Sequence, residues 1–579
     1  MPGKFIFTGN EDFREVRNGD LYFVDKTAII KELVENRGAK VFLITRPRRF
    51  GKTLTMTMLR EFFDIERQNS SALFEGLAIS KEKGLCHTWM NQHPVLFLSL
   101  KEIKASTGTF AESYDRFCAL VGRLCLEHSY LLKSRKVPKQ TKKILSGLLD
   151  RTAGIADVTD VLRTLSFALH QHWGKEAIIL IDEYDAPLAH VRHGENYDRL
   201  VSFIGNLLES GLKTNFSLEF AIMTGCLRIA KESVYTGLNH VRCYGVDEPL
   251  FADKFGFTAE EVKKILFDTR LSHKEDDMRA WYDGYCFGTD QEIYCPWDVL
   301  MYIDSLQRNP DALPQTFWAN TSGNDIVKLC IEQGNEPVKK EISALLSNGE
   351  IQTSLNCALT YDGLNASRET IWTLFYMTGY LTKVPGTKQG AELVTMRIPN
   401  KEIKKLFIRI IDDWFVNTVN NMDLFPFFSA FWNGDEKELI KYLSSIILKT
   451  VSCFDAYKED YYHGFITGLF VKYKKTTYSS RECGHGFADI IITDDDSKNA
   501  AVIEIKRTKS LKELSSLPDI ALQQIHTRQY DEQLCKEYEN VLHWGFAFCG
   551  KYCLAKCEVV KSMQDTEYGI LFKNFPHDN

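Results

Sequence analysis

Residues 40–59, KVFLITRPRRFGKTLTMTML, restrict the possible folds of this chain more than any other segment. The apolar run 41–45 predicts a buried strand, and GKT at 51–53 predicts a helix that opens after a tight loop. Backbone N–H groups at such a helix start surround a phosphate group, while Lys52 reaches the β- and γ-phosphates and Thr53 ligates Mg²⁺. Arg46 stands where the pattern GxxxxGK[ST] has its first Gly, and GKT alone also occurs on surface turns. The strand before the loop and the helix after it favour nucleotide binding.

A second buried strand, residues 177–181, ends in the two carboxylates Asp182 and Glu183. In a parallel sheet, such a strand brings a Mg²⁺-binding Asp and a water-activating Glu to the edge that carries the phosphate loop. The alternative is a buried strand followed by a solvated acidic turn. The phosphate-loop motif upstream makes that alternative the weaker one.

Two more buried strands are expected, at 94–100 and 218–225. The first lies in sequence between the two phosphate-site strands, which matches the ATPase subclass that inserts a strand between them in the sheet. Thr224, near the end of the second, has the position of a γ-phosphate sensor. Arg228, one helical turn on, is either an arginine finger, in cis or across a subunit boundary, or a surface arginine near a helix start.

The predicted nucleotide site binds ATP and Mg²⁺ and draws on both motifs. Its members are Arg48, Arg49, Phe50, Gly51, Lys52, Thr53, Leu54, Asp182, Thr224 and Arg228, with Thr53 and Asp182 as metal ligands and Glu183 as the catalytic acid. Residues 13–36 predict an aromatic hairpin-like segment and a short amphipathic helix, in a region that often covers the adenine of P-loop ATPases. Tyr22, Asp25 and Lys26 are weaker candidates there, because packing and helix capping by Asp25 or Thr27 explain them equally well.

The bulk composition describes an ordinary globular protein with several domains. At 579 residues, and about 150 residues per domain, roughly three or four units are expected. The net charge of −6 argues against a generally basic nucleic-acid coat, so contact with DNA or RNA needs local patches. One basic run, whose default interpretation is a solvated surface, comprises Lys133, Arg135, Lys136, Lys139, Lys142 and Lys143.

The start of the chain, its apolar runs and its cysteines favour a soluble, cytoplasmic protein. The start, MPGKFIFTGNEDF, has no signal-peptide pattern, and no apolar run has the length of a membrane span. The 15 cysteines are scattered, so reduced thiols are expected. Cys549, Cys553 and Cys557 lie four residues apart, but their surroundings alternate like a strand, a turn and a strand, which disfavours a metal site.

The middle of the chain predicts helices and a small sheet. An aromatic-rich stretch at 279–297 is more typical of a packed lid or hinge than of a base-stacking platform. Residues 341–407 have a winged-helix pattern, with a helix at 369–377, strands at 380–384 and 393–398, and a helix from Pro399. Winged helices bind DNA or serve as ATPase lids, and the pattern does not distinguish the two. Residues 423–452 predict a helical connector.

A second group of candidate catalytic and metal-binding residues lies near the C-terminus, after an apolar helix predicted at 461–472. Asp489 opens one predicted strand, and Glu504 and Lys506 share a face of the next, 501–506. A turn between these strands brings the two carboxylates together, where they hold Mg²⁺ beside a Lys that serves the attacking water and the pentavalent phosphate. The alternative is a same-face surface pair on an edge strand.

This D…ExK arrangement resembles the core of the PD-(D/E)XK nuclease superfamily. Gln523, Gln524 and Tyr530 resemble the helical motif that helps to place DNA in many members, and Glu482 is an auxiliary acid candidate. Such nucleases often have Gly-Arg-Pro before the catalytic Asp, whereas here Phe487-Ala488 follows Gly486. Loss of that Arg weakens phosphate contact but leaves the metal ligands.

The whole chain resembles a bacterial family of AAA-ATPase-like proteins fused to this nuclease domain. The resemblance rests on FREVRNGDLYFVDKT, RPRRFGKT, the Asp182-Glu183 strand, TGCLRIAKES, WYDGYCFG, FYMTGYL, RIPNKE and the Asp489/Glu504/Lys506 set. It implies that Arg46 is the family's own loop variant.

We therefore expect an α/β protein with a P-loop NTPase parallel sheet at 1–250, a helical and winged-helix-like region at 251–420, a connector at 421–452 and a nuclease-like α/β domain at 453–579. The expected function is ATP hydrolysis coupled to Mg²⁺-dependent cleavage of nucleic acid by a possible homo-oligomer. DNA is favoured over RNA as the substrate. In the alternative, a nucleotide-dependent switch or scaffold uses the nuclease fold only to bind nucleic acid or a partner.

Overall fold

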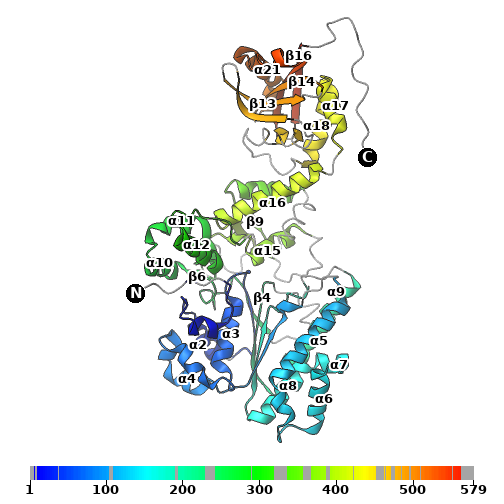
Figure 1. Cartoon of the computed structure of the whole chain (residues 1–579). Helices are drawn as coiled ribbons and strands as arrows, with labels where there is room; N and C mark the ends of the chain where they lie inside the picture. The colour runs from blue at the N-terminus through cyan, green and yellow to red at the C-terminus, as the bar shows by residue number, and fades with distance from the viewer. Residues whose placement is uncertain are drawn as a thin grey trace. The chain divides into compact units, whose positions relative to one another are not determined.

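The computed structural model describes residues 6, 9–36, 38–103, 108–188, 194–227, 241–288, 290–318, 336–355, 367–386, 392–420, 423–450, 462, 465–467, 469–470, 476–483, 486–494, 497–508, 510–550 and 552–561. The chain forms two compact units, Met1–Asn324 with Glu350–Phe407 and Asp325–Gly349 with Ile408–Asn579 (Figure 1). Among the described residues, no helix combines the length and apolar character needed to cross a bilayer.

The first unit is built on a parallel sheet with the order β2-β3-β4-β1-β5. These strands are β1 (Val41–Thr45), β2 (Val95–Ser99), β3 (Ala177–Asp182), β4 (Leu218–Gly225) and β5 (Val241–Tyr244). The residues of β1 and β3 are buried throughout, as expected for strands covered on both faces. A strand does lie between the two phosphate-site strands, but it is β4, while β2 is at the edge beyond β3.

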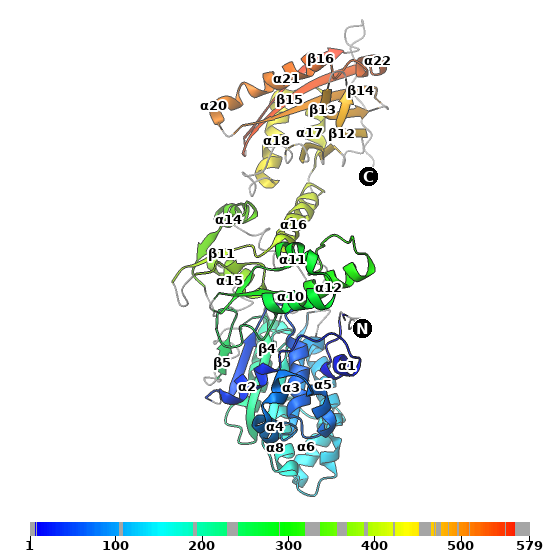
Figure 2. The same ribbon diagram turned by 90° about the vertical axis from the view of Figure 1, so that its left-hand side faces the viewer.

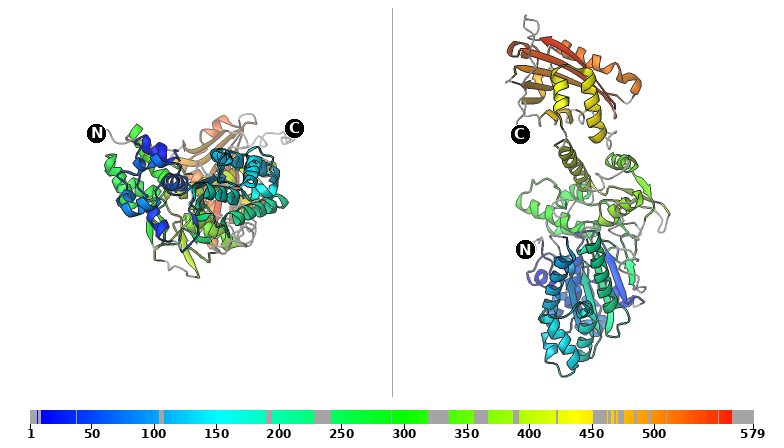
Figure 3. Two further views of the ribbon diagram at one scale, coloured as in Figure 1. Left: turned by 90° about the horizontal axis from the view of Figure 1, so that it is seen from below. Right: turned by 90° about the vertical axis from the view of Figure 1, so that its right-hand side faces the viewer.

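Helices cover both faces of this sheet. One layer comprises α1 (Phe13–Asn18), α2 (Ala28–Glu35), α3 (Lys52–Phe63) and α4 (Lys83–Trp89), packed in one hydrophobic cluster. The other comprises α5 (Phe110–Glu127), α6 (Lys139–Leu149), α7 (Ile155–Thr159), α8 (Val161–Trp173) and α9 (Glu195–Leu212), packed in a second. The left view of Figure 3 separates the blue helices of the first layer from the cyan helices of the second.

The prediction of a hairpin-like segment before α2 is wrong, because that part of the chain begins with helix α1. Asp12 caps α1 by accepting from the Glu15 backbone N–H, and this local bond outweighs the aromatic alternation that suggested strands. In the irregular stretch that follows, Tyr22 donates to Asp268 at 2.7 Å, and Lys26 donates to Glu261 at 2.6 Å. Asp25 accepts a hydrogen bond from the backbone N–H of Thr27 at 2.9 Å. These contacts join the segment to α10 and order the start of α2.

Two small antiparallel sheets complete the first unit. One has the order β6-β8-β7 and packs with α10 (Ala259–Asp268), α11 (Glu275–Tyr282) and α12 (Pro296–Arg308); its strands are β6 (Phe257–Thr258), β7 (Tyr285–Phe287) and β8 (Gln291–Tyr294). The other has the order β10-β11-β9, with β9 (Ile351–Thr353), β10 (Thr382–Lys383) and β11 (Val394–Arg397), near α15 (Arg368–Thr378). The helix predicted at 369–377 and the two strands after it are therefore present. Helix α16 (Lys401–Asn420) runs from the first unit into the second.

The second unit contains α14 (Glu336–Leu346) and a five-stranded sheet with the order β12-β13-β14-β15-β16. The strands are β12 (Thr476–Cys483), β13 (Gly486–Asp494), β14 (Asn499–Arg507), β15 (Asn540–Cys549) and β16 (Tyr552–Lys561). Neighbouring strands pair antiparallel except β14 and β15, which are parallel. Helices α17 (Phe425–Trp432) and α18 (Glu436–Thr450) lie on one face, and α20 (Leu511–Leu514), α21 (Leu517–Arg528) and α22 (Leu534–Glu537) on the other (Figure 2).

The two faces of this sheet pack against different helices, because side chains alternate between the faces along each strand. Ile503 and Ile505 of β14 pack in the cluster with α17 and α18, whereas Val502 packs in the cluster with α21. Helix α21 approaches closely because position 545 is Gly: a Cβ there would lie 2.3 Å from the Pro518 carbonyl oxygen. The strand, turn and strand predicted around the C-terminal cysteines are confirmed as β15 and β16, and the described cysteines are free thiols. Of the apolar helix predicted at 461–472, the described residues are helical.

Candidate functional site

The phosphate loop joins β1 to α3 and has an anion-binding geometry. Gly51, the residue before α3, has φ +82°, and the space where its Cβ would stand is open. Lys52 is buried, and its Nζ donates to the carbonyl oxygens of Arg46 and Pro47, each at 3.0 Å. These bonds hold the ammonium group over the loop. A phosphate group bound by the loop would replace the two carbonyl oxygens as its partner. The residues present therefore fit a nucleotide phosphate.

Asp182, the last residue of β3, connects this strand to β4 and to the loop helix α3. Its carboxylate accepts from Thr53 at 2.9 Å and from Thr224 at 2.7 Å. The Asp182 side chain is fully buried, and this burial raises its pKa, which the two hydroxyl bonds and the Lys52 charge oppose. Glu183 follows in a left-handed conformation with φ +50°. A hydroxyl, a carboxylate and a buried ammonium group thus meet at one sheet edge, as in a Mg²⁺–phosphate site.

Asp185 is a member of this centre that the sequence reasoning missed. It is almost completely buried and accepts from the backbone N–H groups of Cys226 and Leu227, at 3.0 and 2.9 Å. Its charge acts on Lys52, and it packs so closely that a Cβ on Gly225 would lie 2.7 Å from its Oδ1. The available signal was an acid three residues after Asp182. The Asp185 carboxylate fixes the chain just after β4, directly before Arg228, which lies outside the described residues.

Arg46, which replaces the usual Gly, has a structural role at the base of the loop. Its side chain is fully buried, and Nη1 donates to the carbonyl oxygens of Thr45, Tyr244 and Gly245 at 2.8–3.0 Å. Nη2 donates to the Phe251 carbonyl oxygen at 2.9 Å. Burial lowers its pKa to about 10, so the guanidinium is charged at neutral pH. Arg46 therefore ties β1 to β5 and to the segment after it.

The rest of the loop contacts the aromatic segment predicted as a lid, 279–297, and Trp318, which follows it in the chain. The guanidinium of Arg49 lies 4.3 Å from the ring centroid of Trp297, a cation–π contact. Nε1 of Trp318 donates to the Arg48 carbonyl oxygen at 3.3 Å, and the Phe50 ring packs edge-on against Tyr285 at 5.1 Å. The conformation of the phosphate loop is consequently tied to residues about 250 positions away in the chain.

A pair of buried carboxyls stands behind these loop contacts. Asp298 of α12 and Glu402 of α16 are each 1% exposed and share a hydrogen bond, and each leaves one oxygen without another partner. Glu402 also accepts from the Trp318 backbone N–H at 2.7 Å. Burial raises the pKa of Asp298 to about 7 and that of Glu402 further. The pair consequently holds a shared proton at neutral pH.

Glu402→Gln is expected to raise the melting temperature of the protein at pH 8.5 by a few °C, while its effect at pH 5 is small. Because both carboxyl pKa values are raised on folding, the wild type loses stability as pH rises above about 4.5 and through about 7. Gln keeps the bond from Trp318 and needs no proton. Differential scanning fluorimetry from pH 5 to 9 measures the change. Glu292→Gln, at an exposed position of β8, is the control; a pH profile that is the same in the Glu402 variant and the wild type would contradict the shared proton.

The second candidate centre lies on the α21 face of β13 and β14. The antiparallel register pairs Ile490 with Ile503. Asp489 and Glu504 are therefore the next pair of directly opposed residues. Asp489 Oδ2 accepts from the Ile505 backbone N–H at 2.8 Å, and Lys506 Nζ donates to Glu504 Oε1 at 2.8 Å. The structure thus brings the predicted acids and lysine together.

Glu504 is suited to hold a cation. Its side chain is 2% exposed, and its Oε2 is buried without a hydrogen-bonding partner among the described residues. Burial raises its pKa to about 7, with Asp489 adding to the shift and Lys506 opposing it. A divalent metal ion satisfies the lone oxygen and stabilises the ionised carboxylate, so the residues present fit Mg²⁺.

The other residues predicted near this centre take different positions. Tyr530 is buried in the cluster beneath α21, whereas Gln523 is exposed and Gln524 half-buried on that helix. Glu482 lies in β12, and its side chain is outside the described residues.

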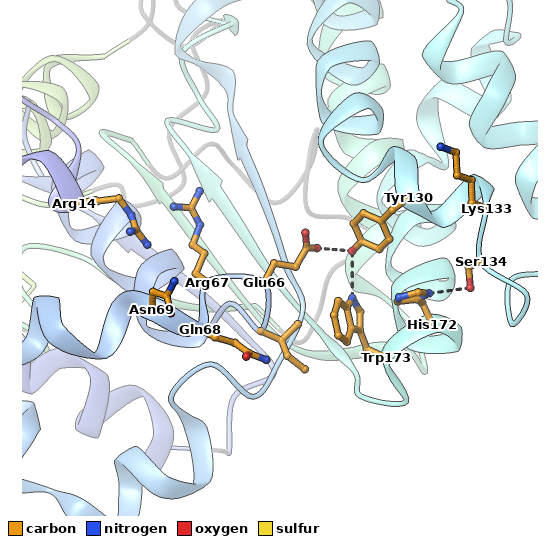
Figure 4. Close-up of a pocket in the computed structure, with 11 residues that line it drawn as sticks. Arg14, Glu66, Arg67, Gln68, Asn69, Tyr130, Lys133, Ser134, His172 and Trp173 are labelled. Atoms are coloured by element: carbon orange, nitrogen blue, oxygen red, sulfur yellow. Dashed lines mark hydrogen bonds between the residues drawn. The ribbon is translucent and has the colours of Figure 1, made fainter.

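A separate pocket of about 820 Å³ lies in the first unit, beyond the end of α3 (Figure 4). The hydroxyl of Tyr130 donates to Glu66 and accepts from Trp173 Nε1 at 3.2 Å. Lys133, from the predicted basic run, reaches its rim. Lys139 and most of the run are exposed, as expected for a solvated surface.

Comparison with known proteins finds a match for each of the two regions that contain these centres. Residues 8–235 match the family model described as "Predicted AAA-ATPase", and residues 457–558 match that of the PD-(D/E)XK nuclease superfamily. A protein of Azotobacter chroococcum mcd 1, named "Uncharacterized protein in vnfD 5'region", is 26% identical over 417 residues, which cover 70% of this chain and 69% of the relative. The parallel sheet with its phosphate loop and the mixed C-terminal sheet are consistent with these two matches. The chain therefore combines an N-terminal AAA-ATPase-like region with a C-terminal region of the PD-(D/E)XK nuclease superfamily.

Proposed function

We propose that this protein binds and hydrolyses ATP and cleaves DNA in a Mg²⁺-dependent reaction. The observation that carries the proposal is the juxtaposition of Asp489, Glu504 and Lys506 on one face of paired strands, with a buried carboxylate oxygen left for a metal ion. Two carboxylates and a lysine in this arrangement are the groups that hydrolysis of a phosphodiester needs.

In the nuclease reaction, Asp489 and Glu504 hold the metal ion, and the Ile505 carbonyl oxygen completes its protein ligands. Bound Mg²⁺ supplies a Lewis acid that polarises the phosphate and lowers the pKa of the attacking water. Lys506 orients that water and neutralises charge that develops on the phosphate. The 2.8 Å bond from Lys506 to Glu504 keeps the ammonium group at this position before substrate binds.

In the ATPase reaction, Lys52 turns from the loop carbonyl oxygens to the β- and γ-phosphates. Thr53 and Asp182 hold Mg²⁺, and Glu183 polarises the hydrolytic water. Thr224, bonded to Asp182 at 2.7 Å, reports the state of the γ-phosphate to β4. Arg228 remains the candidate for an arginine finger.

A nucleotide-dependent switch is the second candidate function, and one observation favours it. The phosphate loop contacts the aromatic segment through Arg49 on Trp297, and Trp318, which follows that segment in the chain, donates to the Arg48 carbonyl oxygen. A nucleotide that rearranges the loop therefore changes the packing of this segment. The sheet order β10-β11-β9 beside α15 supports a winged-helix-like module, which would serve as a lid or contact DNA. A cytoplasmic location and a homo-oligomer are further parts of the proposal.

An assay of the purified full-length protein separates the two functions. Single-stranded DNA, duplex DNA and RNA are incubated with Mg²⁺ or EDTA, with and without ATP. We expect cleavage of DNA in Mg²⁺ that EDTA abolishes. ATP binding without cleavage of any of the three substrates would favour the switch.

A further inference from the structure

A cluster of histidine and acidic side chains lies near the nuclease-like centre, in the second unit. His526 of α21, His543 of β15 and Glu558 of β16 each offer one ligand atom, and these atoms lie within 4.8 Å of one another. Asp531, which follows α21, adds a carboxylate oxygen 3.3 Å from Nε2 of His543. None of these residues belongs to the predicted nucleotide or nuclease sites.

The fold itself brings the cluster together. His543 and Glu558 are directly opposed in the antiparallel pairing of β15 and β16, so their side chains point to the same face. On that face β15 also contributes Val541 to the cluster packed under α21. The close approach of α21 over Gly545 brings His526 to the same place, where its ring centroid is 5.1 Å from that of His543.

His543 is the part of this cluster that packing does not explain. It is completely buried, and its Nδ1 has no hydrogen-bonding partner among the described residues, while Nε2 faces only the Asp531 carboxylate at 3.3 Å without the geometry of a hydrogen bond. A buried polar group without a partner is costly, and an apolar side chain at this position would avoid the cost. The surrounding groups, an imidazole and two carboxylates, are all metal ligands.

We propose that His526, His543, Asp531 and Glu558 bind a divalent transition-metal ion, for which Zn²⁺ is the best fit. Imidazole nitrogens and carboxylate oxygens are ordinary Zn²⁺ ligands at ~2.0–2.2 Å, whereas Mg²⁺ and Ca²⁺ prefer oxygen ligands alone. The side chains of His526 and Glu558 are 50% and 49% exposed. They are therefore able to turn toward an ion that enters from solvent, while His543 fixes its inner position.

Such an ion would join three elements around the nuclease-like centre. His543 pairs with Val502 of β14, which lies two residues before Glu504. Helix α21 covers the face of the sheet from which Glu504 and Lys506 project. The proposed ion thus fixes α21 to β15 and β16 and is structural, and it does not depend on whether the centre at Glu504 is catalytic.

Zinc binding by the full-length protein tests this proposal. The protein carries Glu504→Gln, so that the nuclease-like centre does not contribute, and is freed of metal with EDTA before titration with ZnCl₂. We expect one equivalent of Zn²⁺ to bind and to raise the melting temperature. His526→Ala and Glu558→Gln, both at exposed positions, are each expected to weaken binding by at least ~10-fold.

His87→Ala removes an exposed histidine from α4 in the first unit and is the matched control, expected to bind Zn²⁺ like the parent protein. Absence of Zn²⁺ binding, or binding that neither His526→Ala nor Glu558→Gln weakens, would overturn the proposal. The side chains would then form two ordinary ion pairs, His526 with Glu558 and His543 with Asp531.

Discussion

Glu504→Gln is expected to reduce Mg²⁺-dependent DNA cleavage by at least ~100-fold while leaving the rate of ATP hydrolysis unchanged. The amide has the shape of the carboxylate but lacks the charge that holds the metal ion. Lys506→Ala is expected to cause a similar loss, because it removes the ammonium group 2.8 Å from Glu504. Cleavage of a fluorescent duplex under single-turnover conditions measures both variants.

Folding does not account for this expected loss. Burial raises the pKa of Glu504 to about 7, so its carboxyl lowers the stability of the folded protein as pH rises from about 4.5 through about 7. Gln removes this effect, and the variant is expected to melt no lower than the wild type at pH 8. Glu532→Gln, at an exposed position of the same unit, is the matched control for cleavage. Full cleavage by Glu504→Gln would place the nuclease reaction elsewhere.

Lys52→Ala is expected to reduce ATP hydrolysis by ~10²–10³-fold. The Lys52 ammonium group is the positive charge placed to neutralise the γ-phosphate during transfer, and its buried position among Asp182, Glu183 and Asp185 leaves no other lysine to replace it within the described part of the site. Phosphate release measured at saturating ATP, together with the affinity for a fluorescent nucleotide, reports the effect on catalysis and on binding.

The same variant separates coupling from independence of the two centres. If ATP hydrolysis drives cleavage, Lys52→Ala also loses ATP-stimulated cleavage but retains the cleavage seen without nucleotide. Lys139→Ala, an exposed lysine of α6, serves as the control because it keeps the loop intact. Undiminished ATP hydrolysis by Lys52→Ala would contradict the proposed role of the phosphate loop in that reaction.

Both centres are predictable where the relevant residues are close in sequence. Lys52 and Thr53 belong to one short motif, and Glu504 and Lys506 share a strand face because side chains alternate. Asp489 was found because a short turn joins its strand to the next one. A strand lies between β1 and β3, as in the predicted ATPase subclass, but it is β4 and not β2, because strand order depends on pairing, which apolar runs alone do not specify.

The remaining features depend on partners far apart in the chain. Arg46 donates to Tyr244, which is 198 positions away, so its structural role is not visible in the loop motif. Asp298 and Glu402 meet only because α12 and α16 converge, and no local pattern predicts a shared proton. His526 and His543 likewise come together through the packing of a helix on a sheet. Such contacts follow from the tertiary structure, which periodicity and motif spacing do not determine.

The most direct test of two separate metal centres is a count of bound Mn²⁺, which replaces Mg²⁺ at oxygen-rich sites and is followed by electron paramagnetic resonance. In protein first loaded with one equivalent of Zn²⁺ to fill the proposed histidine site, we expect one nucleotide-independent Mn²⁺ ion that Glu504→Gln removes, and a second that appears only with a non-hydrolysable ATP analogue and that Lys52→Ala removes. A single ion that responds to both variants, or two ions that respond to neither, would contradict the account.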